Sequence, residues 1–170
     1  MGVWDQRSTF DRQLKEHLPR ALRLAVRLTG DLDTAEEVVQ EAMVRASRSW
    51  KTYRGEAPFR GWLYRIVVNT FRDQLAHGPS TRALVDEPLD SKGRQPSEFA
   101  MARELGELVA AEISELPPRQ REVMVLSAFE AMEAGEIALV LRISEESVYS
   151  NLHLARTKLR RRLAHYLAEK

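Results

Sequence analysis

The sequence lacks several residue types and patterns that common functions require. None of its 170 residues is cysteine, which excludes disulfide bonds, thiolate metal sites and cysteine nucleophiles. The four histidines form no close pair, so we expect no metal site. No apolar run approaches the roughly 20 residues that span a bilayer, and no basic stretch at the N-terminus precedes an apolar one. We therefore expect a soluble, cytoplasmic protein without membrane insertion.

Sequence motifs of enzymes are also missing. The chain has no glycine-rich phosphate loop, no nucleophile elbow and no pair of carboxylates in a recognisable motif. We expect no enzymatic activity and no cofactor. Apolar and polar residues nowhere alternate with period two over a useful length, so β-strands are not expected either.

Charge is unevenly distributed although its sum is small. The formal net charge is +1, from 26 basic and 25 acidic residues, which argues against a non-specific coat for nucleic acid. Residues 148–170 contain six basic residues and one acidic residue, whereas residues 105–147 contain nine glutamates and three arginines. A basic tail beside an acidic stretch indicates directed contacts with more than one partner.

Apolar residues at helical spacing predict an all-α protein. A first stripe consists of Phe10, Leu14, Leu18, Ala21, Ala25 and Leu28. Gly30 is expected to end this helix, and Asp33 and Glu36 have the spacing of a capping box for the next one. Further stripes run from Ala35 to Trp50 and from Phe59 to Thr70. Together the three helices predict a small N-terminal domain over residues 5–77.

The chain between residues 78 and 98 has the composition of a flexible linker. It contains proline, glycine, serine and aspartate, and no helical or strand period persists through it. Helical periodicity returns at Phe99 and predicts a second small domain over residues 99–168. One of its helices is expected from Arg119 to about Phe129, with Phe129 facing inward.

Two of the later helices have the pattern of a helix-turn-helix. The first runs from Glu136 to Leu141, and a tight connection at Arg142, Ile143 and Ser144 leads to a long helix capped by Ser144. An ordinary helical hairpin with a solvated charged face remains an alternative on this evidence. In the DNA-binding interpretation, polar side chains early in the long helix meet base edges and later basic ones hold phosphates. The base-facing candidates are Glu145, Glu146, Tyr149, Ser150, Asn151 and His153, and the phosphate candidates include Arg156 and Lys158.

Basic and aromatic residues are interleaved around the turn that precedes the third helix. Basic side chains can hold a DNA backbone while exposed rings stack on unpaired bases. The basic residues are Lys51, Arg54, Arg60, Arg65 and Arg72. Phe59 and Trp62 lie on the apolar stripe and are expected in the core, whereas Tyr53 and Tyr64 lie off it and are expected to be exposed. Asn69 also lies off the stripe, and its amide suits base reading.

Several of these segments resemble conserved regions of bacterial RNA polymerase sigma factors, specifically the extracytoplasmic-function (ECF) group of the sigma-70 family. Residues 116–123, Leu-Pro-Pro-Arg-Gln-Arg-Glu-Val, resemble the beginning of the family's fourth region. Residues 35–41 and 59–69 resemble two helices of its second region. Order, spacing and linker agree over roughly residues 8 to 167. The resemblance implies a non-enzymatic protein that works with core polymerase, promoter DNA and an anti-sigma factor.

The resemblance also implies roles for individual residues. The helix at residues 35–41 would dock on the polymerase clamp, although composition alone would make its acidic face a solvated surface. Its polymerase-binding candidates are Glu36, Glu37, Gln40, Glu41 and Arg45. The third helix and the turn before it would meet the −10 promoter element through Lys51, Arg54, Arg60, Tyr64, Arg65, Asn69 and Arg72. The helix-turn-helix would meet the −35 element.

The sequence departs from the family pattern in the predicted −35 reader. Arg142 stands where the turn glycine is usual, and Tyr149, Asn151 and Leu154 stand at positions that are usually basic. Fewer phosphate contacts imply weaker DNA binding and a shallower salt dependence. The alternative function is therefore a sigma-like protein that binds an anti-sigma factor or polymerase without reading DNA. A stand-alone repressor is less favoured, because it would need neither the clamp-like helix nor the long linker.

Overall fold

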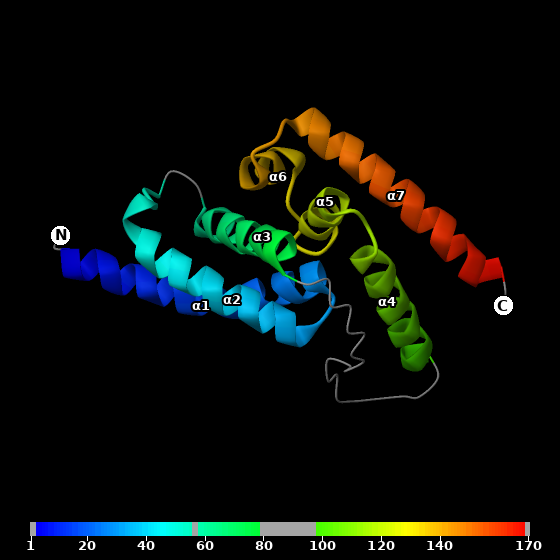
Figure 1. Cartoon of the computed structure of the whole chain (residues 1–170), viewed down its shortest axis with the longest axis horizontal. Coiled ribbons are helices and arrows are strands. Elements are labelled where there is room, and N and C mark those ends of the chain that lie inside the picture. Colours follow the sequence, from blue (N-terminus) through cyan, green and yellow to red (C-terminus); the bar gives the residue numbers. More distant parts are fainter. Residues whose placement is uncertain (1–2, 56–57, 79–97, 169–170) are drawn as a thin grey trace.

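A computed structural model describes residues 3–55, 58–78 and 98–168, and these ranges contain seven α-helices and no β-strand (Figure 1). The all-α prediction is confirmed. Residues 79–97, which make up nearly all of the predicted linker, lie outside the described part of the chain.

Three helices and one short turn build the N-terminal domain. They are α1 (Val3–Thr29), α2 (Leu32–Ser49), the 3-10 turn η1 (Trp50–Thr52) and α3 (Phe59–His77). The three α-helices pack against one another in every pairing, because each buries an apolar stripe. The stripe predicted for α1 is correct except at Leu18, which is 42% exposed, whereas Leu24 is fully buried.

The predicted capping box at the start of α2 is wrong. Gly30 ends α1 with φ +87°, a conformation that favours glycine, and its N–H donates to Val26 O at 2.8 Å. The next residue, Asp31, is extended and caps α2, accepting a hydrogen bond from the Thr34 N–H at 2.8 Å. Asp33 therefore lies in the first turn of α2 and not at its cap. The reason is that α2 begins at Leu32, directly after the left-handed Gly30 and the cap residue Asp31.

Four helices build the C-terminal domain: α4 (Glu98–Ser114), α5 (Pro118–Ala128), α6 (Ala134–Leu141) and α7 (Glu145–Ala168). The helix-turn-helix of α6 and α7 is present as predicted. The Ser144 hydroxyl accepts the Ser147 N–H at 3.1 Å and so caps α7. Phe129 does not face inward: it follows the last residue of α5, is 40% exposed, and its ring lies under the Arg27 guanidinium at 4.4 Å.

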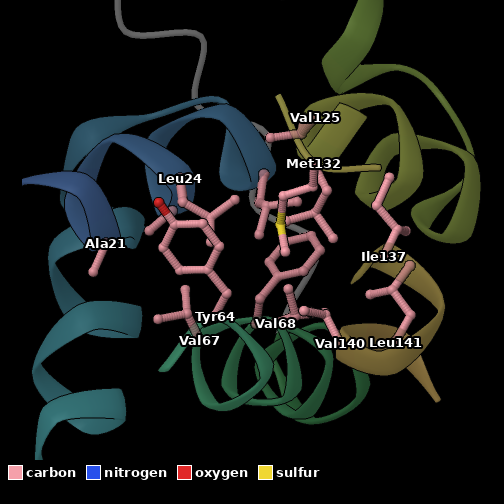
Figure 2. Close-up of a cluster of buried hydrophobic side chains, with 14 of the residues drawn as sticks. Ala21, Leu24, Tyr64, Val67, Val68, Val125, Met132, Ile137, Val140 and Leu141 are labelled. Atoms are coloured by element: carbon pink, nitrogen blue, oxygen red, sulfur yellow. The ribbon is translucent and has the colours of Figure 1, made fainter. Parts of the chain in front are cut away.

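The two domains share one continuous hydrophobic core, and α3 lies in the middle of it (Figures 1 and 2). One side of α3 packs on α1 and α2, and another side packs on α6. Val68 is buried for this second reason, although it lies outside the predicted stripe. The approach is close at Gly61, where a Cβ atom would lie 3.9 Å from a methyl carbon of Val140 in α6.

The turn of the helix-turn-helix carries a strained residue. Arg142 has φ 54° and ψ 52°, the left-handed conformation that a helix C-terminus commonly gives to glycine. A side chain at such a position costs roughly 1–2 kcal/mol, because its Cβ atom approaches the following carbonyl oxygen.

We expect Arg142→Gly to stabilise the protein by about 1 kcal/mol relative to Arg142→Ala, since both remove the charge and only glycine relieves the strain. Urea unfolding of the two variants measures the difference. Equal midpoints would show that the left-handed turn stores no strain.

Candidate nucleic-acid and polymerase interfaces

The predicted polymerase face of α2 is exposed to solvent. Glu36, Glu37, Gln40 and Glu41 lie opposite the buried side of the helix, which comprises Ala35, Val38, Val39, Ala42 and Ala46. An acidic, solvated surface of this kind suits a basic partner.

Arg45 connects the acidic face to α3. Its guanidinium donates to Asp73 Oδ2 at 2.5 Å and to Glu41 Oε1 at 2.9 Å. Hydrogen bonds to Asp73 and then to Glu41 raise the pKa of Arg45. The exposed pair with Glu41 adds little stability by itself, but the two contacts hold Arg45 in one orientation beside the face.

The predicted −10 residues fall into two groups. Lys51, Arg54 and Asn69 are exposed, as a DNA contact requires. The other four contact the C-terminal domain: Arg60, Tyr64, Arg65 and Arg72. All seven predicted −10 residues therefore lie on α3 or in the turn before it, but only Lys51, Arg54 and Asn69 are exposed to solvent.

Aromatic rings before and at the start of α3 form a cluster rather than a set of free stacking surfaces. Phe59 is buried, as predicted, and Trp62 is half-buried. Tyr53 is also half-buried, with its ring centroid 5.2 Å from that of Phe59 and 5.5 Å from that of Trp62. Phe10 of α1 completes the contact at 5.6 Å from Phe59. Such edge and tilted contacts stabilise the turn.

The predicted exposure of Tyr64 is wrong, because its side chain is fully buried. Its hydroxyl donates to Glu130 Oε2 at 2.5 Å, and its ring lies within the shared core (Figure 2). Burial, and then the hydrogen bond to Glu130, raise the pKa of Tyr64 well above its ordinary value. The sequence pattern predicted one buried face on α3, whereas the helix has two.

The three arginines are held by acceptors of the C-terminal domain. Arg72 donates to both carboxylate oxygens of Glu122, at 2.7 and 2.6 Å. Arg65 donates to the Leu139 carbonyl at 2.6 Å. Burial, and then the positive charge of Arg142, lower the pKa of Arg65.

Arg60 lies between two acceptors. One of its nitrogens is 3.5 Å from the Glu136 carboxylate, and another is 3.4 Å from the Glu130 carbonyl. Sequence reasoning did not identify Glu122, Glu130 or Glu136 as partners of the −10 residues. The available signal was charge complementarity between the glutamate-rich stretch and the basic third helix.

The predicted −35 residues lie on the outer side of α7. Glu145, Glu146, Ser150, His153 and Arg156 are exposed, and Tyr149 is 59% exposed. Asn151 is half-buried, and its amide nitrogen already donates to the Ser147 carbonyl at 2.8 Å, which leaves its carbonyl oxygen as the free acceptor. Lys158 is half-buried further along the helix.

Other kinds of site receive no support from the described residues. They contain no group of histidine, aspartate and glutamate side chains that could hold a metal ion. None of the helices in the described ranges is long and apolar enough to cross a membrane.

Comparison with known protein families gives two matches that follow the domain division. Residues 13–78 match Sigma-70 region 2, and residues 106–159 match Sigma-70, region 4. Among relatives, the chain is 32% identical to the ECF RNA polymerase sigma factor SigE of Mycolicibacterium smegmatis over 95% of its own length and 64% of that protein. It is 33% identical to the ECF RNA polymerase sigma-E factor of Escherichia coli, over 71% of its own length and 69% of that protein.

Two solved structures have a similar fold. One is the sigma factor RpoE in complex with the anti-sigma factor NepR from Bartonella quintana, with a TM-score of 0.75 and 19% identity over 92% of this chain and 97% of that one. The other is CnrH in complex with the cytosolic domain of CnrY, with a TM-score of 0.68 and 28% identity over 95% and 94%.

The buried Tyr64 hydroxyl gives a prediction about stability. We expect Tyr64→Phe to lower the free energy of unfolding by about 2 kcal/mol at neutral pH, because the Glu130 carboxylate loses a buried donor. Folding raises the pKa of Tyr64 above the ordinary 10.0, so its protonated hydroxyl stabilises the folded state fully below about pH 10 and progressively less above it. The difference between wild type and variant should therefore shrink in alkaline urea titrations. Tyr166→Phe, at a 48% exposed position, is the control and should change little.

Proposed function

Because the chain belongs to the sigma-70 family, as an ECF sigma factor, we propose that it binds core RNA polymerase and directs initiation at promoters through the individual residues described above. The observation that carries the proposal is the distribution of surfaces. An acidic face on α2, a basic set around α3 and a helix-turn-helix at α6 and α7 occupy different elements of one fold. A protein of this kind contributes contacts to initiation and no catalysis of its own.

The polymerase contact is assigned to the exposed face of α2. Glu37, Gln40 and Glu41 are the main contacts, with Glu36 beside them and Arg45 oriented by Asp73. A basic surface on the polymerase would be attracted to this face over a distance of about one Debye length.

The −10 contact is assigned to α3 and the preceding turn. Arg54 and Arg72 suit the phosphate backbone, and Asn69, exposed on α3, suits base reading because its amide can both donate and accept. Lys51, Arg60, Tyr64 and Arg65 complete the set. Engagement of Arg60, Tyr64, Arg65 and Arg72 requires the C-terminal domain to move away from α3.

The −35 contact is assigned to the first turns of α7, which reach deepest into a major groove in helix-turn-helix proteins. The acceptor of Asn151 and the glutamates can bond to donors on adenine and cytosine, and no arginine or lysine is available there for guanine. We therefore expect a modest −35 preference, with affinity coming largely from backbone contacts by Arg156 and Lys158.

An anti-sigma factor is a further proposed partner, because two similar structures are complexes of sigma factors with such proteins. A second candidate function follows from the weakly basic start of α7: a sigma-like protein that occupies polymerase or an anti-sigma factor without reading DNA. The two functions differ in one measurement. Holoenzyme assembled with this chain initiates at mapped promoters only if the chain reads DNA.

We expect the combined changes Glu37→Lys, Gln40→Lys and Glu41→Lys to abolish holoenzyme formation while helicity stays unchanged, because all three positions are exposed. Size-exclusion binding to core polymerase and far-ultraviolet circular dichroism measure the two properties. The matched control is Glu104→Lys, Glu107→Lys and Ala110→Lys on exposed positions of α4, which changes the net charge equally. Normal core binding by the α2 variant would reject this face as the contact.

We expect Asn69→Ala to relax specificity at one −10 position, at a cost of about 1–3 kcal/mol there. Arg54→Ala should instead weaken all −10 variants about equally, because a phosphate contact carries no sequence information. Initiation rates of the holoenzyme on a set of −10 variants distinguish these patterns. A uniform loss with Asn69→Ala would remove it as the base reader.

A further inference from the structure

We propose that a cleft between η1, α3 and α6 binds a small aromatic carboxylate, with the ring among apolar side chains and the carboxylate on arginines. Residues 52–65 of one domain and 132–140 of the other line this cleft, whose volume is about 180 Å³. The inference goes beyond the proposed function, because that function involves macromolecules alone: polymerase, promoter DNA and an anti-sigma factor. It does not depend on any residue's role toward DNA.

The walls of the cleft are largely apolar. Tyr53 and Trp62 are half-buried, and their ring centroids lie 5.5 Å apart. Met132 and Val140, at 6% and 4% exposure, belong to the buried cluster shown in Figure 2. Leu139 is 65% exposed, the highest value for a large apolar side chain in the part of the chain that the structure describes. A ligand that covers Leu139 would remove this apolar surface from water, which favours binding.

The size of the cleft points to a single ring. A cavity of about 150 Å³ with apolar walls holds one benzene molecule. A cleft of about 180 Å³ therefore accommodates one six-membered ring and a short polar group attached to it. Aromatic walls favour an aromatic ring, because edge-to-face and offset contacts add to the burial of apolar area.

The charges that line the cleft favour an anion. Three arginines and one glutamate contribute to it, namely Arg54, Arg60, Arg65 and Glu136. The side chain of Arg54 is exposed and has no ion pair with a carboxylate elsewhere in the described ranges. Ligand sites in proteins commonly combine an apolar lining with a few charged groups that fix the orientation of the ligand, and a carboxylate is the usual partner of arginine.

Arg60 has only long contacts within the chain. Its nitrogens lie 3.5 Å from the Glu136 carboxylate and 3.4 Å from the Glu130 carbonyl oxygen. A charge-assisted hydrogen bond from a guanidinium to a carboxylate is normally about 2.7–2.9 Å long. The carboxylate of a ligand can therefore offer Arg60 a shorter bond than either of its present acceptors.

Arg65 lacks a compensating negative charge. One of its nitrogens donates to the Leu139 carbonyl at 2.6 Å, while its Nε atom is buried without a hydrogen-bond partner. Among the described residues no carboxylate forms an ion pair with Arg65, and the charge that acts on it most is that of Arg142. An anion in the cleft would stabilise this partly desolvated guanidinium.

The test uses the full-length chain, because both domains line the cleft. Benzoate is the probe, titrated at low salt while amide chemical shifts are followed by NMR. Benzamide has the same ring without the charge, acetate has the charge without the ring, and thymidine 5′-phosphate reports a nucleotide site instead. We expect saturable binding of benzoate, at least tenfold tighter than that of each of the other three. Equal or tighter binding of any of them would overturn the proposal.

Two substitutions at Leu139 locate the site. Because this side chain is 65% exposed, Leu139→Glu and Leu139→Gln should both keep the fold, which circular dichroism checks. The carboxylate introduced by Leu139→Glu would lie at the cleft and repel the anion, so this variant should bind benzoate at least tenfold more weakly than Leu139→Gln.

The matched control is Leu154→Glu with Leu154→Gln, at a 48% exposed position of α7 that does not line the cleft. Both control variants should bind benzoate as the wild type does. Equal affinities of the two Leu139 variants would overturn the cleft as the binding site, and so would a loss with Leu154→Glu as large as that with Leu139→Glu.

Discussion

The arrangement of the two domains depends on buried carboxylates that find their partners across the domain boundary. Glu122 and the side chain of Glu130 are almost excluded from water, and a carboxylate in such a place is unfavourable unless donors replace its hydration. Arg72 supplies two donors to Glu122, which also accepts a hydrogen bond from Arg119 of its own helix at 3.2 Å, and Tyr64 and Arg27 supply donors to Glu130. Separating the domains returns both carboxylates to water, so these contacts give geometric selectivity more than large net stability.

The apolar contact between α3 and α6 supplies favourable free energy that does not depend on these carboxylates. Burial of Val68 and Val140, together with the close approach at Gly61, removes apolar surface from water in a way that requires no particular partner geometry. The hydrogen-bonded carboxylates then select one orientation among those that would bury the same area. The combination explains how two small domains, each with a modest core, form one continuous core.

This arrangement also separates the three surfaces that we propose contact polymerase and DNA. The α2 face and the outer side of α7 need nothing from the domain contact, and both are open. The α3 surface is made of arginines and a tyrosine, which are good ligands for phosphates and bases and equally good ligands for carboxylates. The basic groups on α3 that we propose for DNA contact therefore pair readily with a glutamate-rich segment of the same chain.

The sequence by itself determined the helices and the family, because these follow from local periodicity and from the order and spacing of the motifs. The stripes of α1 and α2, the Ser144 cap and the helix-turn-helix could all be read in this way. The cap of α2 was missed because Gly30 allows the helix to begin two residues earlier than the motif suggested. Tyr64, Phe129 and the partners of Arg72 were decided only by the tertiary structure. Periodicity reports how residues are placed around one helix, whereas the number of its faces that are buried depends on which other elements pack against it, and for α3 those elements come from 50 to 74 residues further along the chain.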